Sequence, residues 1–305
     1  MTTKLKPIEQ QVMVITGASS GVGLTTALTA AKAGARVVLA ARGDALESIV
    51  ERIRQEGGEA IAVRTDVAER PQLEQLAKAA VDRFGRIDTW VNDAGVAIYG
   101  RLDEVSEADS RKLFDTNFWG IVNGSLVALP YLKASCGAPI NIGSEVSEAV
   151  VPLQGMYSAS KHAVKGFTDA LRVEVELVDK TPMAITLIQP TAVNTPYPQH
   201  ARNYMAEEPK LPSPQIDPQQ VADAIIDAAT HHRRDVKVGA VAVINTFIGK
   251  IAPSLADRMC AKQVGNQQYG EPPRAPEGTL TNPGGAGKRH GSGGAVNSRP
   301  SKVSH

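Results

Sequence analysis

Short apolar runs alternate with amphipathic segments along the first part of the chain. Residues 12–16 form an apolar run, a glycine-rich turn follows, and residues 24–33 have the spacing of a helix that Gly34 ends. Residues 36–41 form a second apolar run. Strand, turn, helix and strand in this order make a βαβ unit, which requires its two strands to be parallel.

The same alternation continues through residue 240. It predicts helices over 44–56, 71–84, 106–132, from about 157 to 178, and 218–231, and strands over 60–63, 87–91, 139–142, 183–188 and 236–238. The predicted fold class is therefore α/β. We expect a single domain with a doubly wound, Rossmann-type, mostly parallel sheet and helices on both faces.

Two C-terminal segments depart from this alternation. Residues 243–259 are rich in apolar side chains, and a helix there could pack on the body, on a second subunit or at a membrane surface. Packing within an oligomer is the preferred interpretation. Residues 270–305 are rich in Gly, Pro, Ser and Asn, and we expect disorder because they cannot bury enough surface to offset the entropy of ordering. The predicted organisation is a main domain over 1–240, an apolar helical extension over 241–269 and a disordered tail over 270–305.

Composition and charge narrow the function classes. The 305 residues are 42% hydrophobic with a net charge of +1, so electrostatics gives no argument for nucleic acid as a partner. No apolar run reaches the ~18 residues of a membrane span, and the N-terminus lacks the pattern of a signal peptide. Cys136 and Cys260 lie far apart, without metal-ligand spacing, which fits a reducing compartment. We therefore expect a cytoplasmic protein with a small-molecule substrate and no metal.

The glycine-rich turn after the first strand contains Gly17, Gly21 and Gly23. Backbone without side chains lets a phosphate approach closely, and the N-terminus of the following helix directs unpaired N–H groups at it. The spacing G-x-x-x-G-x-G differs from the G-x-G-x-x-G fingerprint, so the agreement is with the mechanism rather than with that pattern. A plain glycine turn is the alternative, but the flanking strand and helix favour a dinucleotide site.

A second motif combines the side chains of Ser144, Tyr157 and Lys161. Tyr157 and Lys161 are one helical turn apart and share a face. A free tyrosine titrates near ~10, and a nearby ammonium lowers that pKa, so the phenol could exchange a proton with a carbonyl or alcohol oxygen. Ser144 follows a predicted strand and could hold the same oxygen. The alternative is that Tyr157 is a core residue and Lys161 a solvated charge.

Together the two motifs resemble the classical short-chain dehydrogenases/reductases, over about residues 8–240. The glycine turn resembles the cofactor loop of this family, Tyr157 and Lys161 resemble its active site, and Ser144 lies thirteen residues before Tyr157, as the family's catalytic serine does. The resemblance implies that Tyr157 exchanges the proton, while Lys161 lowers its pKa and holds the nicotinamide ribose. It also implies that Ser144 fixes the substrate oxygen and that Asn117 connects Lys161 to solvent through water.

The resemblance further implies a set of cofactor contacts near the strand ends. They are Gly17, Ser19, Ser20, Gly21, Val22, Gly23, Arg42, Asp66, Val67, Asn92, Ala94, Gly95, Tyr157, Lys161, Pro190, Val193 and Thr195. Asp66 could equally cap a turn or helix before Pro71. Two positions depart from the family pattern: Asp93 replaces an Asn and loses its amide donors, and Thr191 replaces a Gly and loses its backbone freedom.

The end of the second strand indicates which cofactor binds. An acid there would bind the adenosine ribose hydroxyls of NAD, whereas an arginine can pair with the 2′-phosphate of NADP. The chain has Ala41 and Arg42 at this point and no acid. We therefore predict NADP(H), with a solvated strand-end arginine as the alternative.

Residues 196–218 are rich in proline and polar residues and fall where the family has its mobile substrate lid. His200, Tyr204 and Met205 are candidate pocket residues in it. The predicted function is an NADP(H)-dependent oxidoreductase that interconverts a carbonyl and a primary or secondary alcohol, in a homodimer or homotetramer.

Two alternatives to this function stay open. One is a cofactor-binding regulator or scaffold with little catalysis, although such relatives usually lack the Tyr or the Lys. The other is a sugar-nucleotide epimerase or dehydratase of the extended branch, which the glycine spacing and the short C-terminal half disfavour. The sequence does not identify the substrate.

Overall fold

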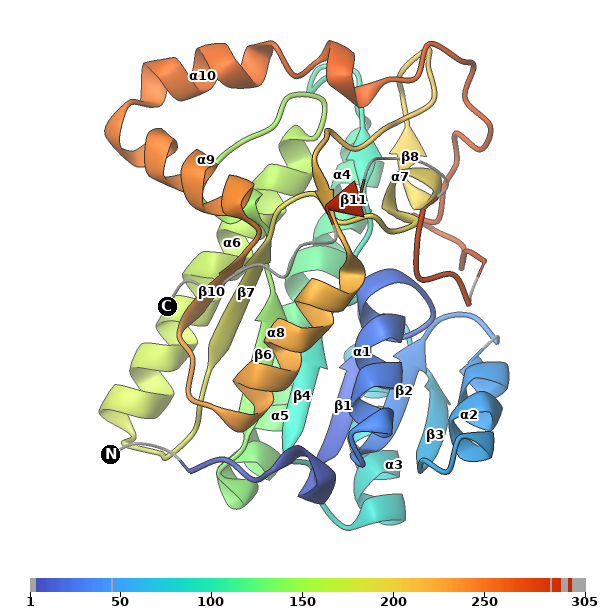
Figure 1. Ribbon diagram of the computed structural model, residues 1–305, viewed down its shortest axis with the longest axis vertical. Helices are drawn as coiled ribbons and strands as arrows, with labels where there is room; N and C mark the ends of the chain where they lie inside the picture. The colour runs from blue at the N-terminus through green and yellow to red at the C-terminus, as the bar shows by residue number, and fades with distance from the viewer. Residues whose placement is uncertain (1–3, 45, 286, 292–295, 298–305) are drawn as a thin grey trace.

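A seven-stranded parallel sheet forms the centre of the computed structural model, which describes residues 4–44, 46–285, 287–291 and 296–297 (Figure 1). The strand order is β10-β7-β6-β4-β1-β2-β3. The strands are β1 (Val12–Thr16), β2 (Arg36–Ala41), β3 (Ala60–Arg64), β4 (Thr89–Asn92), β6 (Ala138–Ile142), β7 (Thr186–Pro190) and β10 (Asp235–Val238). In the central pairings Val14 lies opposite Val38 on one side and opposite Trp90 on the other. The predicted Rossmann-type fold is confirmed.

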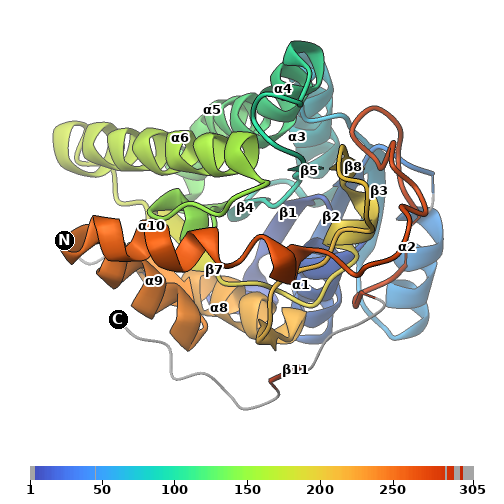
Figure 2. The ribbon, with the colours of Figure 1, turned by 90° about the horizontal axis from the view of Figure 1, so that it is seen from above.

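Helices cover both faces of this sheet (Figures 1 and 2). On one face lie α1 (Gly21–Lys32), α2 (Leu46–Gln55) and α8 (Pro218–Thr230), and on the other lie α3 (Arg70–Phe84), α5 (Gly120–Ser135) and α6 (Gly155–Arg172). Each strand supplies both layers, because alternate side chains point to opposite faces. Met13 and Ile15 join the first hydrophobic cluster, whereas Val12 and Val14 join the second. Strands buried on both faces explain the continuous apolar runs of the sequence.

The long helix expected over residues 106–132 is interrupted by one π-helical turn. Ser106 begins it by accepting a hydrogen bond from Asp109 N at 3.1 Å. Helix α4 (Glu107–Phe114) then passes through η2 (Asp115–Trp119), which carries Asn117, into α5. Single π-helical turns of this kind are frequent at functional sites. The helix α6 likewise continues as the π-helical segment η4 (Val173–Val178).

Smaller elements surround the carboxyl ends of the strands. They are η1 (Ile8–Gln10), the pair β5 (Ile98–Tyr99) and β8 (Arg202–Asn203), η3 (Glu145–Ser147), α7 (Tyr197–His200), the pair β9 (Gln215–Ile216) and β11 (Val296–Asn297), α9 (Ala240–Ile251), α10 (Pro253–Ala261) and η5 (Gly265–Gln267). No helix in the described part of the chain is both long enough and apolar enough to cross a membrane.

The C-terminal residues 270–285 and 287–291 follow a defined path over the body, which differs from the disorder expected of this segment. Leu280 is 2% exposed and packs with Val96, Ile98 and Leu113. The expectation considered only the apolar surface that the segment itself carries. One buried leucine and hydrogen bonds from the segment's backbone to the main domain supply the remaining contacts. The other residues of the expected tail, 286, 292–295 and 298–305, apart from the short strand β11, lie outside the described residues.

The chain leaves β1 in two directions, first to β2 and β3 and later to β4, β6 and β7. The loops after β1 and β4 therefore diverge, and a crevice forms at the carboxyl ends of these strands. In open α/β sheets this switch point is the usual ligand site.

Candidate active site

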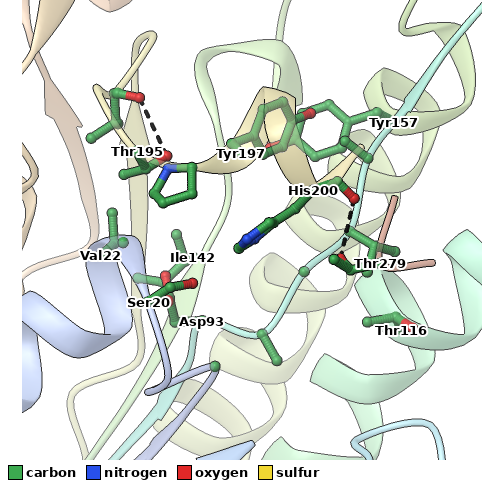
Figure 3. Close-up of a pocket in the computed structure, with 18 of the residues that line it drawn as sticks. Ser20, Val22, Asp93, Thr116, Ile142, Tyr157, Thr195, Tyr197, His200 and Thr279 are labelled. Atoms are coloured by element: carbon green, nitrogen blue, oxygen red, sulfur yellow. Dashed lines mark hydrogen bonds between the residues drawn. The ribbon is translucent and has the colours of Figure 1, made fainter. Parts of the chain in front are cut away.

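A cavity of about 290 Å³ occupies this crevice (Figure 3). It extends from the end of β2 to the start of α6, and the lid covers part of it. The predicted residues that line it are Gly17, Ser19, Ser20, Gly21, Val22, Arg42, Asp66, Val67, Ala94, Gly95, Ser144, Tyr157, Lys161, Pro190, Val193, Thr195 and His200. One cavity therefore joins the glycine turn, the strand ends and the serine–tyrosine–lysine group.

Asn92 was predicted to contact the cofactor, and the structure places it elsewhere. Its side chain shares a strand face with Trp90 and points into the core. It accepts a hydrogen bond from Trp90 Nε1 at 2.8 Å and donates to Asn141 Oδ1 at 2.8 Å and to Ser125 Oγ at 3.1 Å. Asn92 therefore belongs to a buried polar network between β4, β6 and α5.

The glycine turn brings three parts of the backbone into close contact. Gly17 has φ +71°, and a Cβ there would lie 2.8 Å from Ala94 Cα. Gly23 does not line the cavity, but a Cβ on it would lie 2.5 Å from Gly17 O and 2.7 Å from Asp93 Oδ2. Larger residues at either position would separate β1 from the loop after β4.

Ser144, Tyr157 and Lys161 converge from two neighbouring elements. Ser144 lies just after β6, where its hydroxyl caps η3 by accepting from Val146 N at 3.3 Å. Tyr157 and Lys161 lie on the first turns of α6, and the Tyr157 hydroxyl is hydrogen-bonded to Ser144. Lys161 Nζ donates to Ile142 O at 2.8 Å and lies 5.7 Å from the centre of the Tyr157 ring. The end of β6 thus fixes all three polar groups.

The pKa of Tyr157 differs from the expectation that Lys161 lowers it. Burial raises this pKa to about 12, against the hydrogen bonds from Ser144 and Tyr197, and the negative charge of Asp93 raises it further. The Lys161 amine donates to Ile142 O at 2.8 Å. In this structure Tyr157 is therefore a neutral phenol at physiological pH.

Lys161 and Asp93 form a buried pair of titratable groups. Burial lowers the pKa of Lys161 to about 8, and the nearby charge of Asp93 opposes this change. Burial raises the pKa of Asp93 to about 7, against the charge of Lys161 and a hydrogen bond from Gly23 N–H. An acid is tolerated at position 93 because the positive N-terminus of α1 and an ammonium both face it.

Asn117 lies behind the cavity rather than in its wall. Its Oδ1 accepts from Val96 N at 2.8 Å, and its Nδ2 donates to Val96 O at 3.0 Å and to Ser160 Oγ at 3.3 Å. These bonds join the loop after β4 to α6. The side chain therefore positions the loop that carries Ala94 and Gly95.

The opposite end of the cavity is lined by Arg42 and Asp66. The Arg42 guanidinium donates to Thr279 O at 2.5 Å and to Leu280 O at 3.2 Å, both in the C-terminal segment. Asp66 Oδ1 accepts from Ala68 N at 3.0 Å and so also stabilises the turn before α3. Arg42 thus lines the cavity and also forms hydrogen bonds to the C-terminal segment.

The lid contributes an aromatic residue, Tyr197, that the sequence analysis missed. Tyr197 packs edge-on against Tyr157 with ring centres 5.4 Å apart (Figure 3). Its hydroxyl donates to Gln154 Oε1 at 2.8 Å. The candidates Tyr204 and Met205 do not line the cavity. Tyr204 donates to Asp109 Oδ2 at 2.6 Å, and Met205 packs beside Ala201. No motif marks Tyr197, because its position depends on the path of the lid.

Thr191, the second departure from the family pattern, is held by its neighbours. Its backbone N–H donates to Val238 O at 3.0 Å, and its hydroxyl is hydrogen-bonded to the buried carboxyl of Glu145. Gly239, with φ +98°, makes room for it, since a Cβ there would lie 2.6 Å from Thr191 Cγ2. Glu145 also lines the cavity and was not predicted.

The cavity fits an extended anionic dinucleotide. Helix α1 directs its first-turn N–H groups at the cavity, and within the described residues the Val22 N–H has no protein acceptor. Gly17 and Gly21 keep this wall free of side chains, and Arg42 supplies a cation at the far end. Ser144 and Tyr157 offer two hydroxyl groups at the other end, where a carbonyl oxygen could accept from both.

Comparisons with known proteins agree with this arrangement. A family model described as short chain dehydrogenase matches residues 11–205. The uncharacterized oxidoreductase YxnA of Bacillus subtilis is 39% identical over 277 residues, which cover 90% of this chain and 78% of YxnA.

Two solved structures are also similar. A short chain dehydrogenase/reductase from Burkholderia phymatum, in complex with NAD, has a TM-score of 0.72 at 27% identity and covers 83% of this chain and 96% of its own. An alcohol dehydrogenase from Thermococcus sibiricus, complexed with 5-hydroxy-NADP, has a TM-score of 0.66 at 26% identity and covers 76% of this chain and 97% of its own.

Proposed function

Because the chain belongs to the short-chain dehydrogenase/reductase family and is an oxidoreductase of that family, we propose that it reduces a carbonyl to an alcohol with NADPH, or catalyses the reverse reaction with NADP. One observation carries the proposal. Ser144, Tyr157 and Lys161 meet at one end of a cavity whose other end carries Arg42, with the N-terminus of α1 between them. A bound nicotinamide would supply or accept the hydride, and the protein would supply position and proton.

Each side chain then has a defined task. Ser144 and Tyr157 hold the substrate oxygen through their hydroxyl groups, and Tyr157 donates its proton to that oxygen as the alcohol forms. Burial raises the pKa of Tyr157 to about 12, so the phenol is protonated at neutral pH and can act as the proton donor in the reductive direction. Lys161 stabilises the phenolate that remains, because its pKa of about 8 leaves it largely protonated at neutral pH.

The choice of NADP(H) rests on the end of β2. Arg42 lines the cavity there, and Ala41 gives no carboxylate that could bind ribose hydroxyls. One similar structure holds a derivative of NADP and the other holds NAD, so the relatives leave both cofactors open.

The experiment follows NADPH consumption by absorbance against a panel of aldehydes and ketones, with NADH in parallel. Tyr157→Phe serves as the inactive variant. Tyr131→Phe is the matched control, because Tyr131 lies on α5, is 37% exposed and does not line the cavity. We expect turnover that prefers NADPH, is lost in Tyr157→Phe and is kept in Tyr131→Phe.

Other outcomes would contradict the proposal in distinct ways. Wild-type rates in Tyr157→Phe would exclude Tyr157 as the proton donor. A preference for NADH would reject the role of Arg42 in cofactor choice. Tight NADPH binding without turnover across a broad panel would favour the regulator or scaffold.

A further inference from the structure

The C-terminal strap, defined as residues 279–285 and 287–291, lies along the cavity and contacts the lid at one end and the start of α1 at the other. Thr279, Pro283, Gly284 and Gly285 line the cavity itself. The strap thus brings residues from the end of the chain to the glycine turn near its beginning, and it forms a wall of the cavity that no motif indicated.

One end of the strap is fixed to the lid and to β2. Thr279 donates from its backbone N to His200 O at 2.8 Å and from its Oγ1 to the same oxygen at 3.1 Å (Figure 3). Leu280 is buried, and the carbonyl oxygens of Thr279 and Leu280 accept from Arg42. This end is held by backbone groups and one apolar side chain.

The other end is fixed to the glycine turn and to α1. Gly287 N donates to Ser19 O at 2.8 Å, and Lys288 O accepts from Gly21 N at 2.9 Å. Arg289 donates from Nε to Thr25 Oγ1 at 3.2 Å and from its terminal nitrogen to Gln219 Oε1 at 2.7 Å.

His290 continues this attachment, because its Nε2 lies 3.1 Å from Asp217 Oδ2. Residues 287–291 therefore contact the glycine turn, which would hold the pyrophosphate, and the helices α1 and α8.

The first turn of α1 shows how the strap and a phosphate could share this wall. Three N–H groups there lack acceptors within the helix. Gly21 N–H binds Lys288 O, and Gly23 N–H binds the Asp93 carboxyl. In the part of the chain that the structure describes, the Val22 N–H group has no protein acceptor and stays available to a ligand. The strap therefore occupies part of the anion site and leaves this group open.

The backbone of Lys288 lies at the same site, because its carbonyl oxygen accepts from Gly21 N at 2.9 Å. His200 lines the cavity, and its pKa is lowered by burial and by the nearby positive charge of Lys288. Among the described residues, no carboxylate forms an ion pair with Lys288. The Lys288 side chain therefore starts beside the N-terminus of α1, and its ammonium is within reach of an anion bound there.

Building on the proposed function, we propose that the C-terminal strap is the outer wall of the dinucleotide site and that Lys288 binds the pyrophosphate of the cofactor. Since the strap lines the cavity and is fixed at both the lid and the glycine turn, it would retain the bound dinucleotide and detach at one end for exchange. Lys288 would then be a cofactor-binding residue common to NADPH and NADH, whereas Arg42 would act on the 2′-phosphate alone.

A strap that competes with the cofactor is the opposite possibility, and the chemistry of the segment disfavours it. A segment that imitated the phosphates would carry acidic side chains, whereas residues 288–290 are Lys, Arg and His. The strap also lines a cavity of about 290 Å³ rather than filling it.

The test measures NADPH and NADH affinity by fluorescence titration of the full chain, comparing wild type with Lys288→Gln. Lys262→Gln is the matched control, since Lys262 is an exposed lysine that follows α10 and does not line the cavity. We expect Lys288→Gln to weaken both cofactors about tenfold at low salt, because a charge-assisted contact is lost. The difference should narrow at high salt, where exposed charges are screened.

A second variant tests the strap as a retaining element. Arg289→Ala removes the bonds to Thr25 and Gln219 but leaves Lys288 in place, so stopped-flow measurements should show faster NADPH release. Unchanged affinity in Lys288→Gln together with unchanged release in Arg289→Ala would overturn the proposal. Tighter binding in either variant would overturn it as well, in favour of a competing strap.

These readouts separate the strap from the proposed function. The expected affinities without any turnover would support the strap while contradicting the oxidoreductase activity. A wild-type chain that bound neither dinucleotide would overturn both.

Discussion

The two ends of the cavity are built in different ways. At the catalytic end, Ser144, Tyr157 and Lys161 come from one short stretch that spans the end of β6 and the start of α6. At the opposite end, called the adenosine end because the proposed cofactor would place its adenosine there, Arg42 contacts Leu280, 238 residues further along the chain. The first arrangement needs only a strand end beside a helix, whereas the second needs the whole fold. The comparison suggests that the catalytic end sets the reaction and the adenosine end sets cofactor choice and exchange.

The largest expected effect comes from Tyr157→Phe, a substitution that disrupts only the catalytic end. Tyr157→Phe keeps the ring and removes the proton, so kcat should fall by about 10²–10⁴, the usual contribution of a positioned acid or base. NADPH affinity should stay within about twofold, because the adenosine end is untouched. Steady-state kinetics and fluorescence titration on the same preparation would check both. A large loss of affinity would show that the two ends are not separate.

The complementary variant, Arg42→Ala, disrupts the adenosine end. Arg42→Ala should weaken NADPH about 10–100-fold, because a guanidinium–phosphate pair is lost, and should change NADH affinity little. With saturating NADPH, kcat should remain close to wild type. Arg52→Ala is the control, since Arg52 is an exposed arginine of α2 that pairs with Glu56. Equal losses for NADPH and NADH would mean that Arg42 acts mainly by holding the C-terminal strap.

The same contrast explains what the sequence could predict. The fold and the gathering of Ser144, Tyr157 and Lys161 follow from apolar periodicity and short spacings. Parallel strands place the loops after β1, β4 and β6 at one edge, whatever the details of packing. The glycine turn was predictable for the same reason, because Gly17 is required wherever β1 meets the loop after β4.

The remaining features depend on contacts between residues that are far apart in the sequence, and such contacts leave no recognisable sequence pattern. Asn92 lies at a strand end, but the pleat turns its side chain toward α5 rather than the cavity. The strap binds Arg42 through carbonyl oxygens, which every residue has, so no side chain signals the contact. The raised pKa of Tyr157 follows from burial, which cannot be inferred from the four-residue spacing of Tyr157 and Lys161.

Asp93 lies between the glycine turn and Lys161, and its titration should affect the stability of the fold rather than turnover. Its folded pKa of about 7 exceeds the ordinary 3.8, so the folded state binds more protons than the unfolded state between these values. The free energy of unfolding should therefore decrease as pH rises from about 4 to about 7, and by roughly 2–3 kcal/mol between pH 5 and pH 8. Asp93→Asn should lose this dependence.

Thermal melting at both pH values would check this expectation. Asp82→Asn is the matched control, because Asp82 is an exposed carboxylate of α3 that pairs with Lys78. The advantage of Asp93→Asn over wild type should be larger at pH 8 than at pH 5. An advantage that is equal at the two pH values would contradict the raised pKa.

The smallest expected effect tests whether the catalytic end is really local. Tyr197 reaches Tyr157 from the lid, and its hydrogen bond lowers the Tyr157 pKa, partly offsetting the effect of burial. Tyr197→Phe removes that hydroxyl and its bond to Gln154, so the Tyr157 pKa should rise and kcat should fall about fivefold, as expected for one hydrogen bond. Tyr204→Phe removes a lid hydroxyl that binds Asp109 of α4, and so separates this effect from general loosening of the lid. A drop in kcat in Tyr197→Phe alone would mean that the lid tunes the proton donor, so that closing over substrate and preparing the acid are one event. Equal drops in both variants would mean that the lid acts only by covering the site, and the catalytic end would then be as self-contained as its sequence motif.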